Sequence, residues 1–197
     1  MSKGACLVAT VALCVACSSE GPQPTAPISV PVFSDADRSP NANGGNYGTP
    51  LSGDEEVPAR PTRARGSAVF QLSEDGTELS YKLIVANIEN VFQAHIHRGA
   101  FGANGPIVVW LFPDTDPEVG PRGQGRLDGV IAKGTITAAN FQNVLAGQPM
   151  STLIADLKNG NAYVNVHTDD GIDPTNTGPG DFPGGEVRGQ IEHRGHR

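Results

Sequence analysis

Three histidines in this sequence are spaced so that they could bind a common ligand. His95 and His97 lie two residues apart in the strand-like run VFQAHIHR, and His167 closes a second alternating run, AYVNVHT. Alternate strand positions point to the same face of a sheet, so His95 and His97 share a face. Neutral imidazole binds zinc and copper well, and three histidines with an open position suit both ions. The pattern therefore suggests a copper or zinc site with His95, His97 and His167 as ligands.

The same histidines also fit a purely structural interpretation. Three predicted strands carry polar residues on the face opposite their apolar face. Besides the histidines, these polar residues are Asn165, Glu186, Arg188 and Gln190. In this interpretation the histidines pair with Glu186 and the main chain, and Arg188 bridges to a carboxylate. The spacing HxH is common on strands by chance, so we favour the structural cluster and keep the metal site as the alternative.

Two other kinds of site are disfavoured. The loop 169–181 carries Asp169, Asp170, Asp173 and Asp181, but their spacing fits no EF-hand, so we do not expect calcium. No serine, cysteine or carboxylate pair stands in a recognisable catalytic arrangement. We therefore lean towards a protein that is not an enzyme.

The elements that would position these residues are short strands. Glycine and proline repeatedly interrupt apolar alternation from Leu51 onward, a pattern typical of all-β domains. Asp75-Gly76 predicts a hairpin turn, and the run 107–112 is apolar on both faces, so another element must cover it. Two short helices predicted over 137–145 and 151–158, with N-caps at Thr137 and Ser151, are candidates for that cover. We expect an antiparallel Greek-key β-sandwich or barrel with one or two short helices.

The N-terminal residues are typical of an export signal. Lys3 precedes an uncharged, mainly apolar run that is too short to span a bilayer, which needs about 20 residues. The run ends in Cys14-Val15-Ala16-Cys17, which resembles a bacterial lipobox except that Cys14 stands where leucine is usual. We expect lipidation of Cys17 and attachment to a membrane, with simple secretion as the alternative. All three cysteines lie in the first 17 residues, so the remainder has no cysteine for a disulfide or a metal.

Composition sets the expected domain limits. We expect a signal peptide over 1–16, a Ser-, Pro- and Asn-rich tether over 17–49, a β domain over 50–193 and a polar tail over 194–197. The chain carries 14 Lys and Arg against 21 Asp and Glu, a formal charge of −7, and no basic cluster. This balance argues against a nucleic-acid partner.

Five short motifs together resemble the CHRD domain, a module named after chordin and found in secreted bacterial proteins. They are EEVP at 55–58, AHIHRG at 94–99, GANGP at 102–106, NVHT at 165–168 and PGGEVRGQI at 183–191. The acidic loop 113–121 and the long segment 169–182 depart from the pattern. The resemblance implies an extracytoplasmic β-sandwich or barrel, and no particular reaction. A weaker similarity links the HIH strand and its glycine-rich turn to the copper strand of copper–zinc superoxide dismutases.

From the sequence we therefore expect a lipid-anchored binding or structural module, periplasmic or on the cell surface. Its expected partners are the membrane, through Cys17, and an unidentified protein or surface ligand. The alternative is a histidine-based copper or zinc protein, including one with dismutase-like activity.

Overall fold

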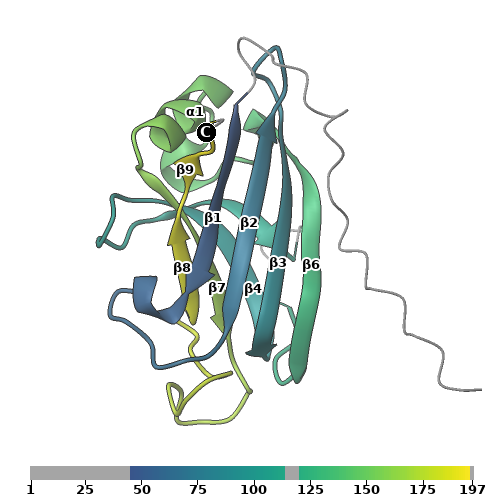
Figure 1. Ribbon diagram of the computed structural model, residues 1–197, viewed down its shortest axis with the longest axis vertical. Helices are drawn as coiled ribbons and strands as arrows, with labels where there is room; N and C mark the ends of the chain where they lie inside the picture. The colour runs from purple at the N-terminus through teal and green to yellow at the C-terminus, as the bar shows by residue number, and fades with distance from the viewer. Residues whose placement is uncertain (1–44, 114–119, 196–197) are drawn as a thin grey trace, which may run out of the picture. The chain divides into compact units, whose positions relative to one another are not determined.

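The computed structural model describes residues 45–113 and 120–195, and within them the chain is mostly β (Figure 1). Its strands form one antiparallel sheet in the order β5-β4-β7-β8-β1-β2-β3-β6, with β9 also paired to β1, and the sheet is nearly closed. The strands are β1 (Asn46–Ser52), β2 (Arg65–Leu72), β3 (Leu79–Glu89), β4 (Val91–Arg98), β5 (Ile107–Phe112), β6 (Arg126–Ile136), β7 (Ala162–Thr168), β8 (Val187–Gln190) and β9 (Glu192–His193). The expected all-β class is confirmed. Strand β1 includes residues that we assigned to the tether.

Strand β3 shows how the sequence pattern builds the core. Leu79, Tyr81, Leu83 and Val85 alternate with more exposed residues and all lie in the hydrophobic core. The turn before β3 is the predicted one: Gly76 has φ +71°, and Asp75 Oδ1 accepts a hydrogen bond from the Thr77 amide at 3.0 Å. Asp-Gly therefore sets this hairpin because glycine tolerates the left-handed backbone and aspartate caps the turn.

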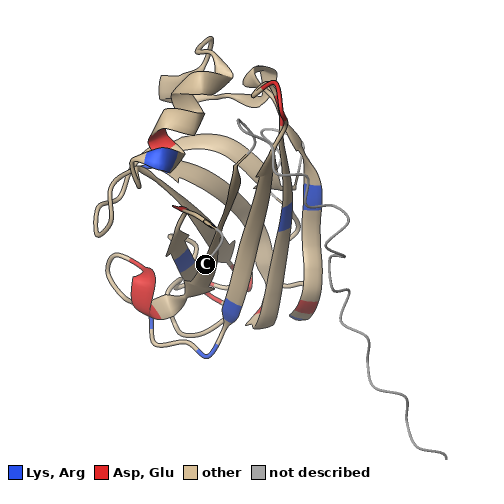
Figure 2. Cartoon of the chain, turned by 45° about the horizontal axis from the view of Figure 1, so that its top comes forward, with Lys and Arg blue, Asp and Glu red and all other residues tan. Residues whose placement is uncertain are grey.

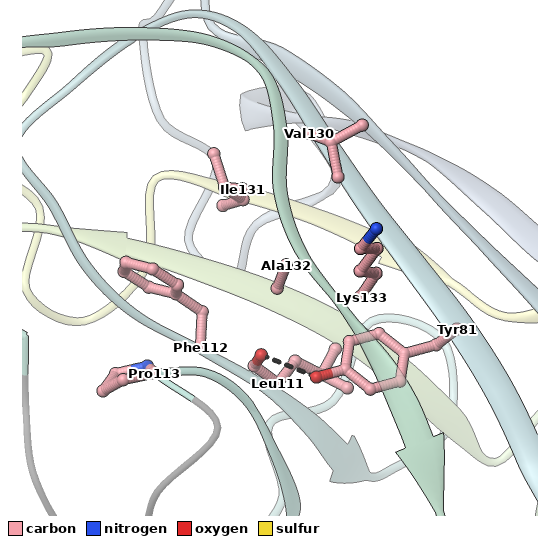
Figure 3. Close-up of a pocket in the computed structure, with 8 residues that line it drawn as sticks. All are labelled: Tyr81, Leu111, Phe112, Pro113, Val130, Ile131, Ala132 and Lys133. Atoms are coloured by element: carbon pink, nitrogen blue, oxygen red, sulfur yellow. Dashed lines mark hydrogen bonds between the residues drawn. The ribbon is translucent and has the colours of Figure 1, made fainter. Parts of the chain in front are cut away.

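The sheet stays open between its two end strands, β5 and β6. Tyr81 from β3 spans this seam and donates its hydroxyl hydrogen bond to the Leu111 carbonyl at 2.9 Å. Beside this bond lies a cavity of about 360 Å³, lined by Leu111 to Pro113 on one side and Val130 to Lys133 on the other (Figure 3). The side chain of Tyr81 thus joins β5 to β3, the strand paired with β6, at this point of the seam.

The segment 138–145 covers strand β5, as expected, but as two 3-10 turns, η3 (Ala138–Asn140) and η4 (Asn143–Leu145). Its Gln142 amide donates to the Val108 carbonyl at 3.0 Å, and Gln142 Oε1 accepts from Trp110 Nε1 at 2.8 Å. Thr137 forms the predicted cap in a capping box with Asn140. The second predicted helix is α1 (Met150–Lys158), and its N-cap is Pro149, so the prediction of Ser151 as N-cap was wrong.

Strands β4, β7 and β8 are buried on both faces. One face belongs to the hydrophobic core, and polar side chains occupy the other, beneath loops that include a short 3-10 turn, η2 (Gly53–Glu55). We expected Glu186 and Arg188 to point outward, but they are only 1% and 2% exposed. The prediction failed because alternation assigns a residue to a face of the sheet without telling what covers that face.

A register shift in β4 changes one further assignment. Between Val91 and Gln93 the pairing with β7 slips, as in a β-bulge. Strict alternation would place Phe92 on the apolar face with Ala94 and Ile96, but its ring lies 6.3 Å from that of His167 instead. Val91, Ala94 and Ile96 fill the hydrophobic core.

Charged residues are scattered over the loops and along β2, β3 and β6 in the view of Figure 2. In the part of the chain that the structure describes, no helix combines the length and apolar character needed to cross a membrane. The predicted signal peptide and most of the predicted tether lie outside the described residues.

Candidate metal centre

Pairing of β4 with β7 brings the three histidines together. His95 lies opposite Asn165 in the antiparallel register, and His167 lies opposite Gln93. One ring nitrogen from each of His95, His97 and His167 lies within 4.8 Å of the others. The exposed fractions are 0%, 8% and 7%, so the cluster is buried.

Two backbone carbonyls fix how His97 and His167 present their rings. His97 Nδ1 lies 2.9 Å from the Gly105 carbonyl oxygen, and His167 Nδ1 lies 2.8 Å from that of Pro183. A carbonyl oxygen only accepts, so each Nδ1 carries the proton and donates. Each neutral ring therefore keeps the lone pair on Nε2. Histidine ligands of metals usually have this arrangement, with the second nitrogen donating to a carbonyl or carboxylate.

His95 completes the cluster through its Nδ1, which lies 3.2 Å from His167 Nε2. In the metal-free state this contact is a hydrogen bond in which His95 donates, because His167 Nε2 is the acceptor. His95 Nε2 and His97 Nε2 are then buried with no hydrogen-bond partner among the described residues. An unpartnered buried polar atom typically costs about 1–3 kcal/mol. Three histidines held together for stability alone would thus leave the lone pair of His97 Nε2 unused, whereas a ligand bound at His95 Nδ1, His97 Nε2 and His167 Nε2 would use it and leave His95 Nε2 as an N–H.

Aromatic rings surround the imidazoles. Trp110 meets His95 edge-on with ring centroids 4.1 Å apart, and Tyr163 stacks on His97 at 4.8 Å with an interplanar angle of 8°. Together with Phe92 near His167, these rings exclude water from much of the cluster. The local environment therefore has a low dielectric, which strengthens electrostatic interactions with a charged ligand.

Burial keeps the three rings neutral. Burial and, to a smaller extent, the neighbouring histidines lower the pKa of His95 from 6.5 to about 2. Burial also lowers the pKa of His167 to about 4, against the hydrogen bond to the Pro183 carbonyl, which raises it. The pKa of His97 is lowered chiefly by burial and in part by the nearby charge of Arg188. At neutral pH all three imidazoles are unprotonated and able to act as ligands.

The glycine-rich loop 99–106 is held against the sheet by Arg188. Arg188 donates to Asn104 Oδ1 at 3.1 Å and to the carbonyl oxygens of Ala103 and Ala100, and its guanidinium lies 3.5 Å over the Tyr163 ring. We expected Arg188 to bridge to a carboxylate, and these bonds differ from that expectation. Gly105 is required in the loop, because a Cβ there would overlap the Arg98 carbonyl. The arrangement places the Gly105 carbonyl where it orients His97.

Glu56 is a buried member of the site that the sequence marked only through its family motif. Both its oxygens lie 3.0 Å from Asn165 Nδ2, and the side chain is 6% exposed. Burial raises the pKa of Glu56 from 4.5 to about 7, against the opposing effects of Arg188, Arg60 and Asn165. Gly185 lies against this pair, since a Cβ at its φ of +122° would clash with both side chains.

Glu186 ties three segments together and does not pair with the histidines as we expected. It accepts hydrogen bonds from Thr62 Oγ1 and Thr168 Oγ1, both at 2.6 Å, and from the Gly180 amide at 2.8 Å. Gln190 Nε2 similarly joins the carbonyls of Gly99 and Gly160. These two residues fix the loops that cover the histidines.

The acidic loop after β7 brings three of its four aspartates together. Carboxylate oxygens of Asp169, Asp170 and Asp181 lie within 4.8 Å of one another, while Asp173 is not in the group. Arg122 Nε lies 2.9 Å from Asp169 Oδ2, and Asp181 Oδ2 accepts from Thr177. Much of this group is therefore already balanced by an arginine and by hydrogen bonds within the loop.

Fold and site together define a β-barrel-like domain with a loop-covered cluster of three histidines. The profile of the CHRD domain matches residues 47–191, and the chain belongs to the CHRD domain family. No curated protein is significantly similar to the chain.

Proposed function

We propose that the folded domain binds one copper or zinc ion through His95, His97 and His167. The observation that carries this proposal is the 3.2 Å separation of His95 Nδ1 and His167 Nε2, with His97 Nε2 unpartnered beside them. Two nitrogens bound to one tetrahedral zinc at 2.0–2.1 Å lie about 3.3–3.4 Å apart. The separation of the two side chains is thus close to what a shared ion requires.

The orientation of the rings supports the same proposal. Hydrogen bonds to Gly105 and Pro183 hold His97 and His167 with Nε2 turned away from those carbonyls. Because the strands and loops already fix the rings, binding requires little further ordering of side chains, which favours high affinity. This proposal departs from our preference on the sequence alone, which was the structural cluster.

We propose further that the domain acts outside the cytoplasm, attached to a membrane through lipidated Cys17. Membership of the CHRD family and the lipobox-like Cys14-Val15-Ala16-Cys17 support this location. The protein would then be a binding or structural module that carries a metal ion, periplasmic or at the cell surface. Its proposed macromolecular partner is a protein or a surface ligand, and not a nucleic acid.

The test is the metal content of the full chain purified without an affinity histidine tag. We expect one equivalent of copper or zinc after dialysis, and its loss in the variants His97→Ala and His167→Ala. Added metal should raise the melting temperature of the wild type because it binds the folded state preferentially. His193→Ala is the matched control, since His193 is exposed on β9. If wild type neither retains metal nor gains thermal stability from it, the proposal fails.

A further inference from the structure

The charges around the three histidines distinguish between the ions that could bind there. The donor set contains only neutral imidazoles, because no aspartate, glutamate or cysteine belongs to this group among the described residues. Whatever charge the ion brings is therefore not cancelled by its ligands.

The groups behind the ligands are also neutral. Zinc-bound histidines often donate to a carboxylate, which makes the ring a stronger donor and offsets the charge of the ion. Here His97 and His167 donate to the backbone carbonyls of Gly105 and Pro183 instead. These carbonyls orient the rings without supplying a full negative charge.

Three ionisable side chains, Arg188, Glu56 and Glu186, lie buried in the same polar layer. The carboxylate of Glu186 accepts hydrogen bonds from Thr62, Thr168 and the Gly180 amide. Arg188 is 2% exposed, and its guanidinium lies over the ring of Tyr163, which stacks on His97. The positive charge of Arg188 lowers the pKa of His97 and would also repel a cation bound beside it. Glu56 contacts Asn165 at 3.0 Å, and burial raises its pKa to about 7, so it is partly protonated at neutral pH. None of the three hydrogen-bonds to a histidine of the cluster, so none compensates the charge of a divalent ion directly.

Charge then sets the order of affinities. The cost of transferring an ion from water into a poorly polarisable site rises with the square of its charge, so a divalent ion is penalised about four times as heavily as a monovalent one. Zinc takes four ligands in tetrahedral sites, so a water molecule would have to complete a three-histidine zinc site. Copper(I) forms three-coordinate sites, and the cluster supplies three histidines.

We propose that the ion held at this site is copper(I), bound by three neutral histidines and preferred over zinc(II) and copper(II). This inference rests on the proposed metal site. The polypeptide would then stabilise the reduced state of copper. This goes beyond metal binding as such, because it assigns an oxidation state and a preference to the site.

The experiment measures copper(I) affinity of the full chain by competition with a chromophoric copper(I) chelator under anaerobic, reducing conditions. Zinc(II) and copper(II) affinities are measured in parallel with their own chelators. We expect one copper(I) per chain, bound more tightly than either divalent ion and retained in excess zinc. The X-ray absorption edge of the copper(I) form should be that of a three-coordinate site.

Equal or tighter binding of zinc(II) or copper(II) would overturn the copper(I) assignment and leave the proposed metal site standing. Failure to bind any of the three ions would instead overturn the proposed function itself. The two failures are therefore distinguishable in one set of titrations.

A charge-altering variant tests the reasoning independently. His95→Asp adds an anionic donor and should shift the preference from copper(I) towards zinc(II), whereas His193→Asp, outside the cluster, should leave it unchanged. An unaltered copper(I) preference in folded His95→Asp would show that ligand charge does not set the selectivity. Should His95→Asp fail to fold, the wild-type titrations still decide the question.

Discussion

His95 Nδ1 lies 3.2 Å from His167 Nε2, although 72 positions separate the two residues in the chain. The contact joins neighbouring antiparallel strands, β4 and β7, at a buried position. At this distance the two nitrogens either share a hydrogen bond between neutral rings or bind one ion together. Burial of the cluster and the fixed orientation of its rings make both states possible.

Acid should destabilise the metal-free protein through its histidines. Their pKa values are depressed on folding, to about 2 for His95 and about 4 for His167, from the ordinary 6.5. The stability they contribute is present above pH 6.5 and is lost as the pH falls, because unfolding then takes up protons. Denaturant unfolding of chelator-treated protein between about pH 7.5 and about pH 5.5, one unit on either side of the ordinary histidine pKa, measures this. A flat profile would contradict the buried, neutral state of the rings.

Glu56 should oppose that acid effect. Its pKa is raised on folding to about 7 from 4.5, so its contribution to stability is present below pH 4.5 and is lost as the pH rises through 7. Glu56→Gln removes this titration while keeping an acceptor for Asn165. The loss of stability from pH 7 to 4.5 should therefore steepen by at most about 1.4 kcal/mol per pH unit. Superimposable pH profiles of the two proteins would show that Glu56 is ionised and solvated.

Glu186→Ala should destabilise the domain by about 3 kcal/mol. The substitution leaves Thr62, Thr168 and the Gly180 amide without their shared acceptor, and each unpartnered buried donor costs about 1–3 kcal/mol before relaxation. Denaturant titration gives the free energy of unfolding. Glu78→Ala, at an exposed position, is the control and should change it by less than about 0.5 kcal/mol. Equal effects of the two substitutions would refute the anchoring role of Glu186.

Arg188→Lys should loosen the loop 99–106 even though charge is retained. Lysine cannot reproduce the planar set of donors that arginine directs to Asn104, Ala103 and Ala100. Hydrogen exchange at the Gly105 amide, which donates to the Tyr163 hydroxyl at 3.1 Å, should quicken. Arg126→Lys on the exposed start of β6 should leave that exchange rate unchanged. Unchanged exchange in both variants would mean that the loop is held by other contacts.

Cys17→Ala should release the folded protein from membranes. The sequence predicts that lipid on Cys17 is the anchor, and two acyl chains are what makes such anchoring stable. Fractionation of cells that express the full chain measures the distribution, with Cys6→Ala as a control that should stay in the membrane fraction. Mature Cys17→Ala protein that still sediments with membranes would refute the lipid anchor.

The sequence alone determined the local parts of this protein. Alternation in 79–85 and 162–168 gave the strands and their inward faces, Asp75-Gly76 gave the turn, and Thr137 gave a helix cap. It also placed His95 and His97 on one face, because that inference needs only the two-residue period of a strand. The family motifs extended this to the class of domain.

Only the tertiary structure decided which of those parts come into contact. The order of strands sets β7 beside β4 and so brings His167 to His95, and no local pattern records which strands become neighbours. Loops distant in sequence, carrying Glu56 and Pro183, bury a polar face that periodicity assigned to the surface. Burial and hydrogen bonding turn three histidines into neutral, oriented donors, because desolvation depends on everything packed around a ring and not on its neighbours in the chain.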